Sequence, residues 1–124
     1  MEKPSYYAKL VIDPFKYAYK NKLNPYQFNA IKYITRYKDK NGIEDLQKAI
    51  HCLEEFQEIA CKNNTNATVS AEVKFAIDPL EYAYRNKLDV DQVNAIVYIT
   101  YSVPTKAITI LQKLIQIETE NYTL

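Results

Sequence analysis

The chain has 124 residues, 48% of them hydrophobic and 25% charged, and a formal net charge of +1. This composition is typical of a folded domain and excludes a disordered chain or one with an overall charge that attracts polyanions, so duplex nucleic acid is not an expected partner. The amino-terminal residues lack an apolar signal core and no apolar run is long enough to span a bilayer, which predicts a cytoplasmic protein without a membrane partner.

The first half of the chain carries signals for three helices. Asp13-Pro14 places a side-chain oxygen at a helix N-cap and proline at the first helical position, which predicts a short helix over 14–22. Asn24-Pro25 repeats the signal and predicts a helix over 25–37, followed by a charged loop over 38–42. Apolar residues spaced by three and four predict a third helix over 43–61.

The second half repeats the first at a constant offset of 65 residues, with about half of the positions identical between 9–50 and 74–115. Its helices are predicted over 79–87, 90–101 and 105–120. We therefore predict a first repeat over 1–62, a linker over 63–70 and a second repeat over 71–124. The expected fold is all-α, with two tandem three-helix units packed as a pseudo-twofold helical bundle. A short strand pair at Leu10–Ile12 and Phe75–Ile77 is an open alternative, because both segments are β-prone.

A polar stripe marks the second predicted helix. Asn29, Lys32, Tyr33 and Arg36 are spaced i, i+3, i+4 and i+7 and so share one face. The next helix carries a parallel stripe of Asp45, Lys48 and Cys52. Cations, an amide and a phenol suit a phosphorylated small molecule, because arginine and lysine bind phosphate and tyrosine can stack on a base. The structural alternative is that Lys32 or Arg36 forms an interhelical ion pair with Asp45.

The second copy lacks the charges of this stripe. Val97, Tyr101 and Ile110 occupy the positions of Lys32, Arg36 and Asp45, whereas Asn94 and Tyr98 are retained. This pattern predicts that one half keeps a site and the other supports it or contributes a wall. The candidate ligand-binding residues are Asn29, Lys32, Tyr33, Arg36, Lys38, Lys40, Asp45, Lys48, Asn94 and Tyr98; no catalytic residue and no metal site is assigned.

The cysteines and the paired tyrosines favour structural roles. Cys52 and Cys61 are too few and too far from a histidine cluster for a zinc site, and both are expected to be small buried residues. Tyr17, Tyr19, Tyr82 and Tyr84 alternate at a spacing of two on short helices, so they cannot all face one core. Some of them are expected to contact another subunit of a homo-oligomer.

The run Asn29-Ala30-Ile31-Lys32-Tyr33-Ile34-Thr35-Arg36, a lysine-bearing loop and then Asp45-Leu46-Gln47-Lys48-Ala49 resembles a family of short phage proteins. The best-known member of that mostly uncharacterised family is a phage nucleotide kinase that lacks a P-loop. The resemblance covers about 4–55 directly and 74–118 through the repeat. It implies that Asn29, Lys32, Tyr33, Arg36, Asp45 and Lys48 contact a nucleotide or fix the site, and that the protein acts in the host cytoplasm.

Three functions follow as hypotheses. The favoured one is a binder that sequesters or handles a nucleotide or a nucleotide-derived signal in a basic and aromatic pocket between helices. The first alternative is a nucleoside monophosphate kinase without a P-loop, which would use Mg²⁺. The second is a non-catalytic oligomeric interaction module.

Overall fold

The computed structural model describes residues 11–62 and 74–122, and these residues contain helices and irregular segments but no strand. The elements are α2 (Pro14–Lys20), α3 (Pro25–Arg36), the 3₁₀ helix η1 (Tyr37–Asp39), α4 (Ile43–Lys62), α5 (Pro79–Arg85), α6 (Val90–Thr100) and α7 (Pro104–Tyr122). The predicted all-α class is confirmed. None of the described helices is both long and apolar enough to cross a membrane. The predicted linker over 63–70 lies outside the described residues.

The helices begin where the capping signals predict. Asp13 accepts a hydrogen bond from the Phe15 N–H at 2.8 Å, with Pro14 at the first helical position. Asn24 and Gln27 form a capping box, each side chain accepting a hydrogen bond from the backbone N–H of the other. The second half repeats both arrangements, with Asp78 before Pro79 and Asp89 paired with Gln92. Local sequence therefore sets where these helices start.

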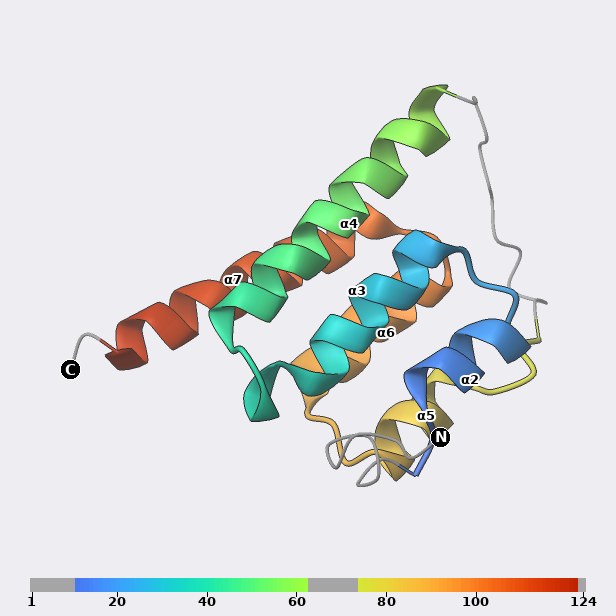
Figure 1. Ribbon diagram of the computed structural model, residues 1–124, viewed down its shortest axis with the longest axis horizontal. Helices are drawn as coiled ribbons and strands as arrows, with labels where there is room; N and C mark the ends of the chain where they lie inside the picture. Colours follow the sequence, from blue (N-terminus) through green and yellow to red (C-terminus); the bar gives the residue numbers. More distant parts are fainter. Residues whose placement is uncertain (1–10, 63–73, 123–124) are drawn as a thin grey trace.

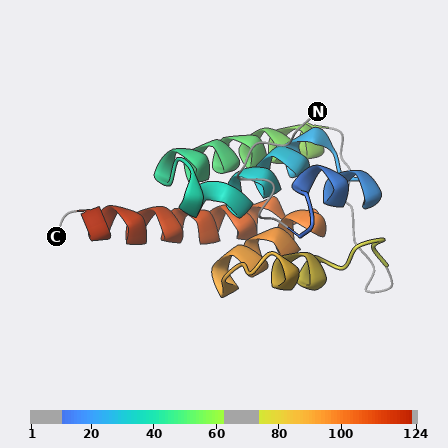
Figure 2. The ribbon, with the colours of Figure 1, turned by 60° about the horizontal axis from the view of Figure 1, so that its bottom comes forward.

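The six α-helices of the described residues form two layers. In Figure 2, α2, α3 and α4 lie in one layer, and α5, α6 and α7 lie in the other. Within each layer the middle helix separates the short helix from the long one, as Figure 1 shows for α3 between α2 and α4. Across the layers, α3 packs on α6 and α4 packs on α7.

The two halves exchange the same side-chain contacts at positions 65 residues apart. The Tyr17 hydroxyl lies 2.8 Å from the Thr100 hydroxyl, and the Tyr82 hydroxyl lies 2.8 Å from the Thr35 hydroxyl. The amide groups follow the same rule, with Gln27 donating to the Ile99 carbonyl and Gln92 donating to the Ile34 carbonyl. Reciprocal contacts of this kind are those of an isologous pairing, in which one surface meets its own equivalent.

The suggested strand pair is wrong for the described residues of those two segments; Leu10 lies outside them. Residues 11–12 and 75–77 are irregular. Instead of pairing with each other, each segment is held by an asparagine from the other half. Asn21 accepts from the Ile77 N–H and donates to the Ile77 carbonyl, both at 2.8 Å. Asn86 does the same for Ile12, at 3.0 and 2.8 Å. One amide side chain thus satisfies the backbone donor and acceptor that a strand neighbour would have satisfied.

Asn21 and Asn86 also explain why α2 and α5 end two residues earlier than predicted. Each asparagine is the C-cap of its helix, and the lysine that follows, Lys22 or Lys87, has a left-handed backbone with φ of 57°. The chain therefore leaves the helix before the predicted ends at Lys22 and Lys87, and the asparagine side chain is free to reach the other half.

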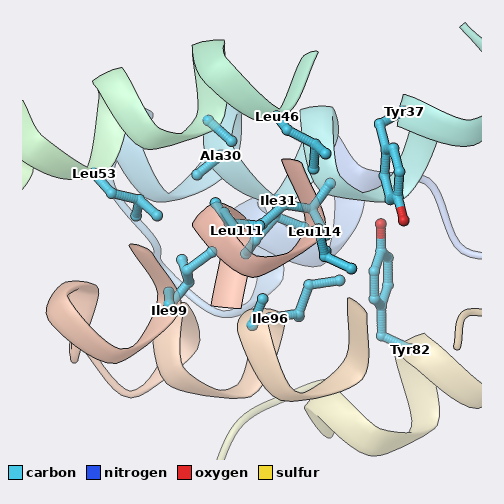
Figure 3. Packing of buried hydrophobic residues seen from close by; sticks show 14 of the residues in the cluster. Ala30, Ile31, Tyr37, Leu46, Leu53, Tyr82, Ile96, Ile99, Leu111 and Leu114 are labelled. Carbon is cyan, nitrogen blue, oxygen red and sulfur yellow. The ribbon is translucent and has the colours of Figure 1, made fainter. Parts of the chain in front are cut away.

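The core lies between the two layers. Figure 3 shows Leu46 and Leu53 of α4 and Ile31 of α3 facing Ile96 and Ile99 of α6, with Leu111 and Leu114 of α7 between them. Because Ile31 and Ile34 are fully buried, the opposite face of α3 is left for the polar stripe. Burial of these side chains from both halves in one cluster indicates that each half depends on the other for its stability.

Candidate functional site

Helices α3 and α4 form an open groove of about 400 Å³ beside the predicted polar stripe. We call it the Tyr33 groove, and its lining residues are Tyr33, Glu44, Gln47, Lys48, His51 and Cys52. Tyr33 comes from α3, and the other five residues lie on successive turns of one face of α4, at the three- and four-residue spacing of a helix.

Three cations gather around the ring of Tyr33. The Lys32 ammonium nitrogen lies 4.8 Å, the Arg36 guanidinium carbon 4.9 Å and the Lys48 ammonium nitrogen 5.8 Å from the ring centroid. Lys32 also lies 5.5 Å from the ring centroid of Phe28. Each distance is within the range of a cation–π contact. Of the side chains predicted to converge between the two helices, Lys32, Arg36 and Lys48 are therefore brought together around Tyr33. Neither Lys32 nor Arg36 is among the described residues that line the Tyr33 groove.

Arg36 and Asp45 form a buried ion pair. The Arg36 Nη2–Asp45 Oδ1 distance is 3.2 Å and the Arg36 Nε–Asp45 Oδ2 distance is 3.3 Å. Asp45 is fully buried and the Arg36 side chain is 15% exposed. The Asn41 N–H also donates to Asp45 at 3.3 Å. For Arg36 and Asp45 the structure therefore shows the interhelical ion pair that the sequence offered as the alternative to ligand binding. The carboxylate is fully buried, and the guanidinium is directed at it.

Of the three cations around Tyr33, Lys32 is the one whose positive charge is not balanced by an ion pair among the described residues. No carboxylate among the described residues lies within ion-pair distance of its ammonium group. Partial burial, together with the positive charges of Arg36 and Lys48, lowers the pKa of Lys32, although Cys52 and Asp45 act in the opposite direction. A cation in this environment gains stability when an anion arrives. Lys48 differs, because it pairs with Glu44 at 3.2 Å on the solvent-exposed face of α4.

Several predicted site residues lie apart from this groove. Lys38 pairs with Asp89 of the second half. That bond and the Gln92 N–H lower the pKa of the Asp89 carboxyl, against the opposing effect of burial. Lys40 is exposed in the loop, and Asn29 is half-buried on α3. None of these three residues lines the Tyr33 groove.

The second half does not reproduce the cation cluster. Asn94 is exposed, and Tyr98, the equivalent of Tyr33, is half-buried with the Lys106 ammonium nitrogen 5.4 Å from its ring centroid. Lys113, the equivalent of Lys48, instead donates to Asp91 at 3.3 Å. Neither Asn94 nor Tyr98 lines the Tyr33 groove.

The prediction missed four residues that line the groove, namely Glu44, Gln47, His51 and Cys52, although Cys52 was placed on the stripe. Their signal was present, because they continue the face of Lys48 at helical spacing, whereas Asp45 lies at the edge of that face nearest α3 and is buried. His51 pairs with Glu55 at 3.1 Å.

The two cysteines differ in their exposure. Cys52 is half-buried, and burial, with a smaller effect of Glu55, raises the pKa of its thiol. Cys61 is exposed, so the expectation that both cysteines are buried is wrong for Cys61. It lies near the end of α4, where the helix extends beyond α3 (Figure 1).

Comparison with known proteins gives one match. Residues 1–54 match the sequence model of a family of proteins of unknown function, DUF3310. The matched stretch covers less than half of the chain and contains all the Tyr33 groove residues. No curated protein and no solved structure matches the chain.

Proposed function

We propose that the protein binds a nucleotide or a nucleotide-derived small molecule in the Tyr33 groove. The observation that carries this proposal is Lys32, a partly buried cation with a lowered pKa and no described carboxylate partner. Lys32 does not itself line the Tyr33 groove, but its ammonium nitrogen lies 4.8 Å from the centroid of the Tyr33 ring, which does. Lys32 and Lys48 bind phosphate oxygens, and Tyr33 provides an aromatic wall for the base or sugar. The groove volume of about 400 Å³ is in the range of small-molecule sites.

Arg36 has a different role in this proposal from the one expected from the sequence. Its guanidinium is bound to Asp45 through two nitrogens, so it holds α3 against α4 and adds positive potential without being a free phosphate ligand. The ligand therefore depends on Lys32 and Lys48 for direct contacts. Removal of Arg36 is expected to change stability more than affinity.

We favour a binding function over phosphoryl transfer. A kinase needs carboxylates to hold Mg²⁺ as well as cations on the transferred group. Asp45 is occupied by Arg36, and the described residues contain no group of three or more His, Cys, Asp or Glu side chains placed to hold a metal ion. Incubation with nucleoside monophosphates, ATP and Mg²⁺, followed by a search for diphosphate, tests the kinase alternative directly.

Calorimetry against a panel of mono-, di- and cyclic nucleotides tests the proposal. Lys32→Val introduces the residue that the second half carries at Val97, and we expect it to weaken binding about 10- to 100-fold, the usual range for a charge-assisted hydrogen bond. Lys48→Gln should also weaken binding. Lys113→Gln is the matched control at the equivalent position and should leave affinity unchanged. Absence of binding across the panel, or unchanged affinity in Lys32→Val, would overturn the proposal.

At pH values near the lowered pKa of free Lys32, binding should also take up protons. A phosphate beside Lys32 raises the pKa that burial lowers in the free protein. Affinity is therefore greatest below the lowered pKa of free Lys32 and falls as the pH rises through that value. Calorimetry in buffers of different ionisation enthalpy measures the uptake, and Lys32→Val should abolish it.

Exposed aromatic residues support the interaction module as a second candidate. Tyr17 and Tyr82 are fully buried, whereas Tyr19 is 74% and Tyr84 is 85% exposed. Phe15 and Leu80, which are equivalent positions, are also exposed beside these tyrosines. Sedimentation velocity measures the oligomeric state, and Tyr19→Ser with Tyr84→Ser should favour the monomer if these faces form subunit contacts.

A further inference from the structure

A second hollow, of about 470 Å³, lies between α2 and α5, away from the Tyr33 groove. We call it the α2–α5 groove. It straddles the two halves, because its lining includes equivalent positions 65 residues apart, namely Ile12 with Ile77, Lys16 with Glu81 and Lys20 with Arg85. The two helices are in different layers of Figure 2 and meet through the rings of Tyr17 and Tyr82, whose centroids are 4.4 Å apart.

The charges of this groove differ between its two walls. On α5, Arg85 pairs with Glu81 at 3.2 Å, one helical turn away. On α2, the equivalent positions are Lys16 and Lys20, two cations at the same i, i+4 spacing. Neither lysine forms an ion pair with a carboxylate of the described residues. Like charges at this spacing destabilise a helix, so α2 carries a local electrostatic cost that α5 avoids.

The positive charge continues into a neighbouring hollow of about 470 Å³, which shares Lys20 with the first and is also lined by Lys22 and Lys74. The described residues that line the two hollows include five cationic side chains and one acidic side chain, a local excess of four positive charges among them. The whole chain has a net charge of only +1, so this concentration is local. Ile12 and Ile77 supply apolar surface beside the cations, and low-dielectric walls strengthen attraction to an anion.

We infer that the α2–α5 groove binds a small anion with two or more phosphate groups. Ammonium and guanidinium groups donate charge-assisted hydrogen bonds to phosphate oxygens, and cations from both halves can act on one ligand. The described residues that line the first hollow are charged or aliphatic, so the inference rests on charge recognition. It shares no lining residue with the Tyr33 groove and is independent of the function proposed there.

The chain itself supplies the variants for a test with inorganic pyrophosphate. Lys16→Glu copies Glu81 and creates on α2 the acid–base pair that α5 already has, so folding should be preserved. We expect calorimetry to show at least about tenfold weaker pyrophosphate binding in this variant. Glu81→Lys should strengthen binding, because it removes the carboxylate from the groove. Lys87→Glu changes the net charge equally but lies outside both hollows, and should leave affinity unchanged.

Two results would overturn the inference. The first is equal weakening by Lys16→Glu and Lys87→Glu, which would mean that pyrophosphate responds only to net charge. The second is that Lys48→Gln loses pyrophosphate binding while Lys16→Glu retains it, which would place the anion in the Tyr33 groove. Nucleotide binding that persists in Lys16→Glu while pyrophosphate binding is lost would support two separate sites.

Discussion

Replacement of Arg36 by methionine tests the Arg36–Asp45 ion pair, in which the carboxylate is fully buried. Arg36→Met removes the guanidinium and leaves the Asp45 carboxylate fully buried. Among the described residues, only Asn41 would still donate to that carboxylate, through its N–H at 3.3 Å and its side-chain amide at 3.5 Å. Neither donor carries a formal charge, so the negative charge would lose its ion-pair partner and keep only the weaker attraction of Lys32 among the described residues.

The expected loss can be estimated from the distances. Two unit charges 3.2 Å apart attract by about 5 kcal/mol at an effective dielectric constant of about 20, and the cost of burying both ions offsets much of this. Loss of one partner of a buried pair destabilises by about 3–5 kcal/mol. Asp45→Ile should cost less, about 1–2 kcal/mol, because the partly exposed guanidinium can regain water.

The double variant makes the test decisive. Arg36→Met with Asp45→Ile removes both charges and places at position 45 the residue that the second half carries at Ile110. Replacement of a buried ion pair by apolar side chains is often neutral or stabilising, so the double variant should be more stable than Arg36→Met alone. Urea denaturation gives the free energies of unfolding, and a thermal scan should show Arg36→Met melting on the order of 10 °C lower than the unsubstituted protein. Additive losses in the double variant would refute the reasoning, because they would show that the two side chains do not interact.

Three further predictions concern the contacts between the halves. Asn21→Ala and Asn86→Ala should each lower the free energy of unfolding by about 1–3 kcal/mol in urea denaturation, since each leaves a partly buried backbone donor and acceptor unsatisfied; a loss for only one of them would contradict their equivalent roles. Burial, with smaller effects of nearby carboxylates, raises the pKa of Tyr37 to about 12. Stability from this group is therefore complete below pH 10 and lost as the pH rises through about 12, so Tyr37→Phe should show a shallower decline over that window in a pH series of denaturation curves. Lys38→Ala should lower the free energy of unfolding by less than about 1 kcal/mol, because both it and Asp89 are more than two-fifths exposed; a larger drop in thermal stability would show that the pair is not an ordinary surface ion pair.

The sequence alone determined the helices and the faces they present. Asp13-Pro14 and Asn24-Pro25 mark helix starts because capping involves residues within one turn of each other. The closeness of Arg36 to Lys32 and Tyr33 was predictable for the same reason, since Arg36 lies four residues after Lys32 and three after Tyr33 on one helix. The charge difference between the two copies was also visible without coordinates.

The tertiary structure decided which of these groups are free. Sequence spacing left Arg36 open to either a ligand or Asp45, and only the packing of α3 against α4 encloses the carboxylate and commits the guanidinium. Likewise, no local pattern shows that Asn21 and Asn86 would hold the backbone of the opposite half, or that Lys16 and Lys20 would share a groove with Arg85. These contacts join residues more than 50 positions apart, and their geometry depends on how two layers of helices meet, which helical periodicity does not encode.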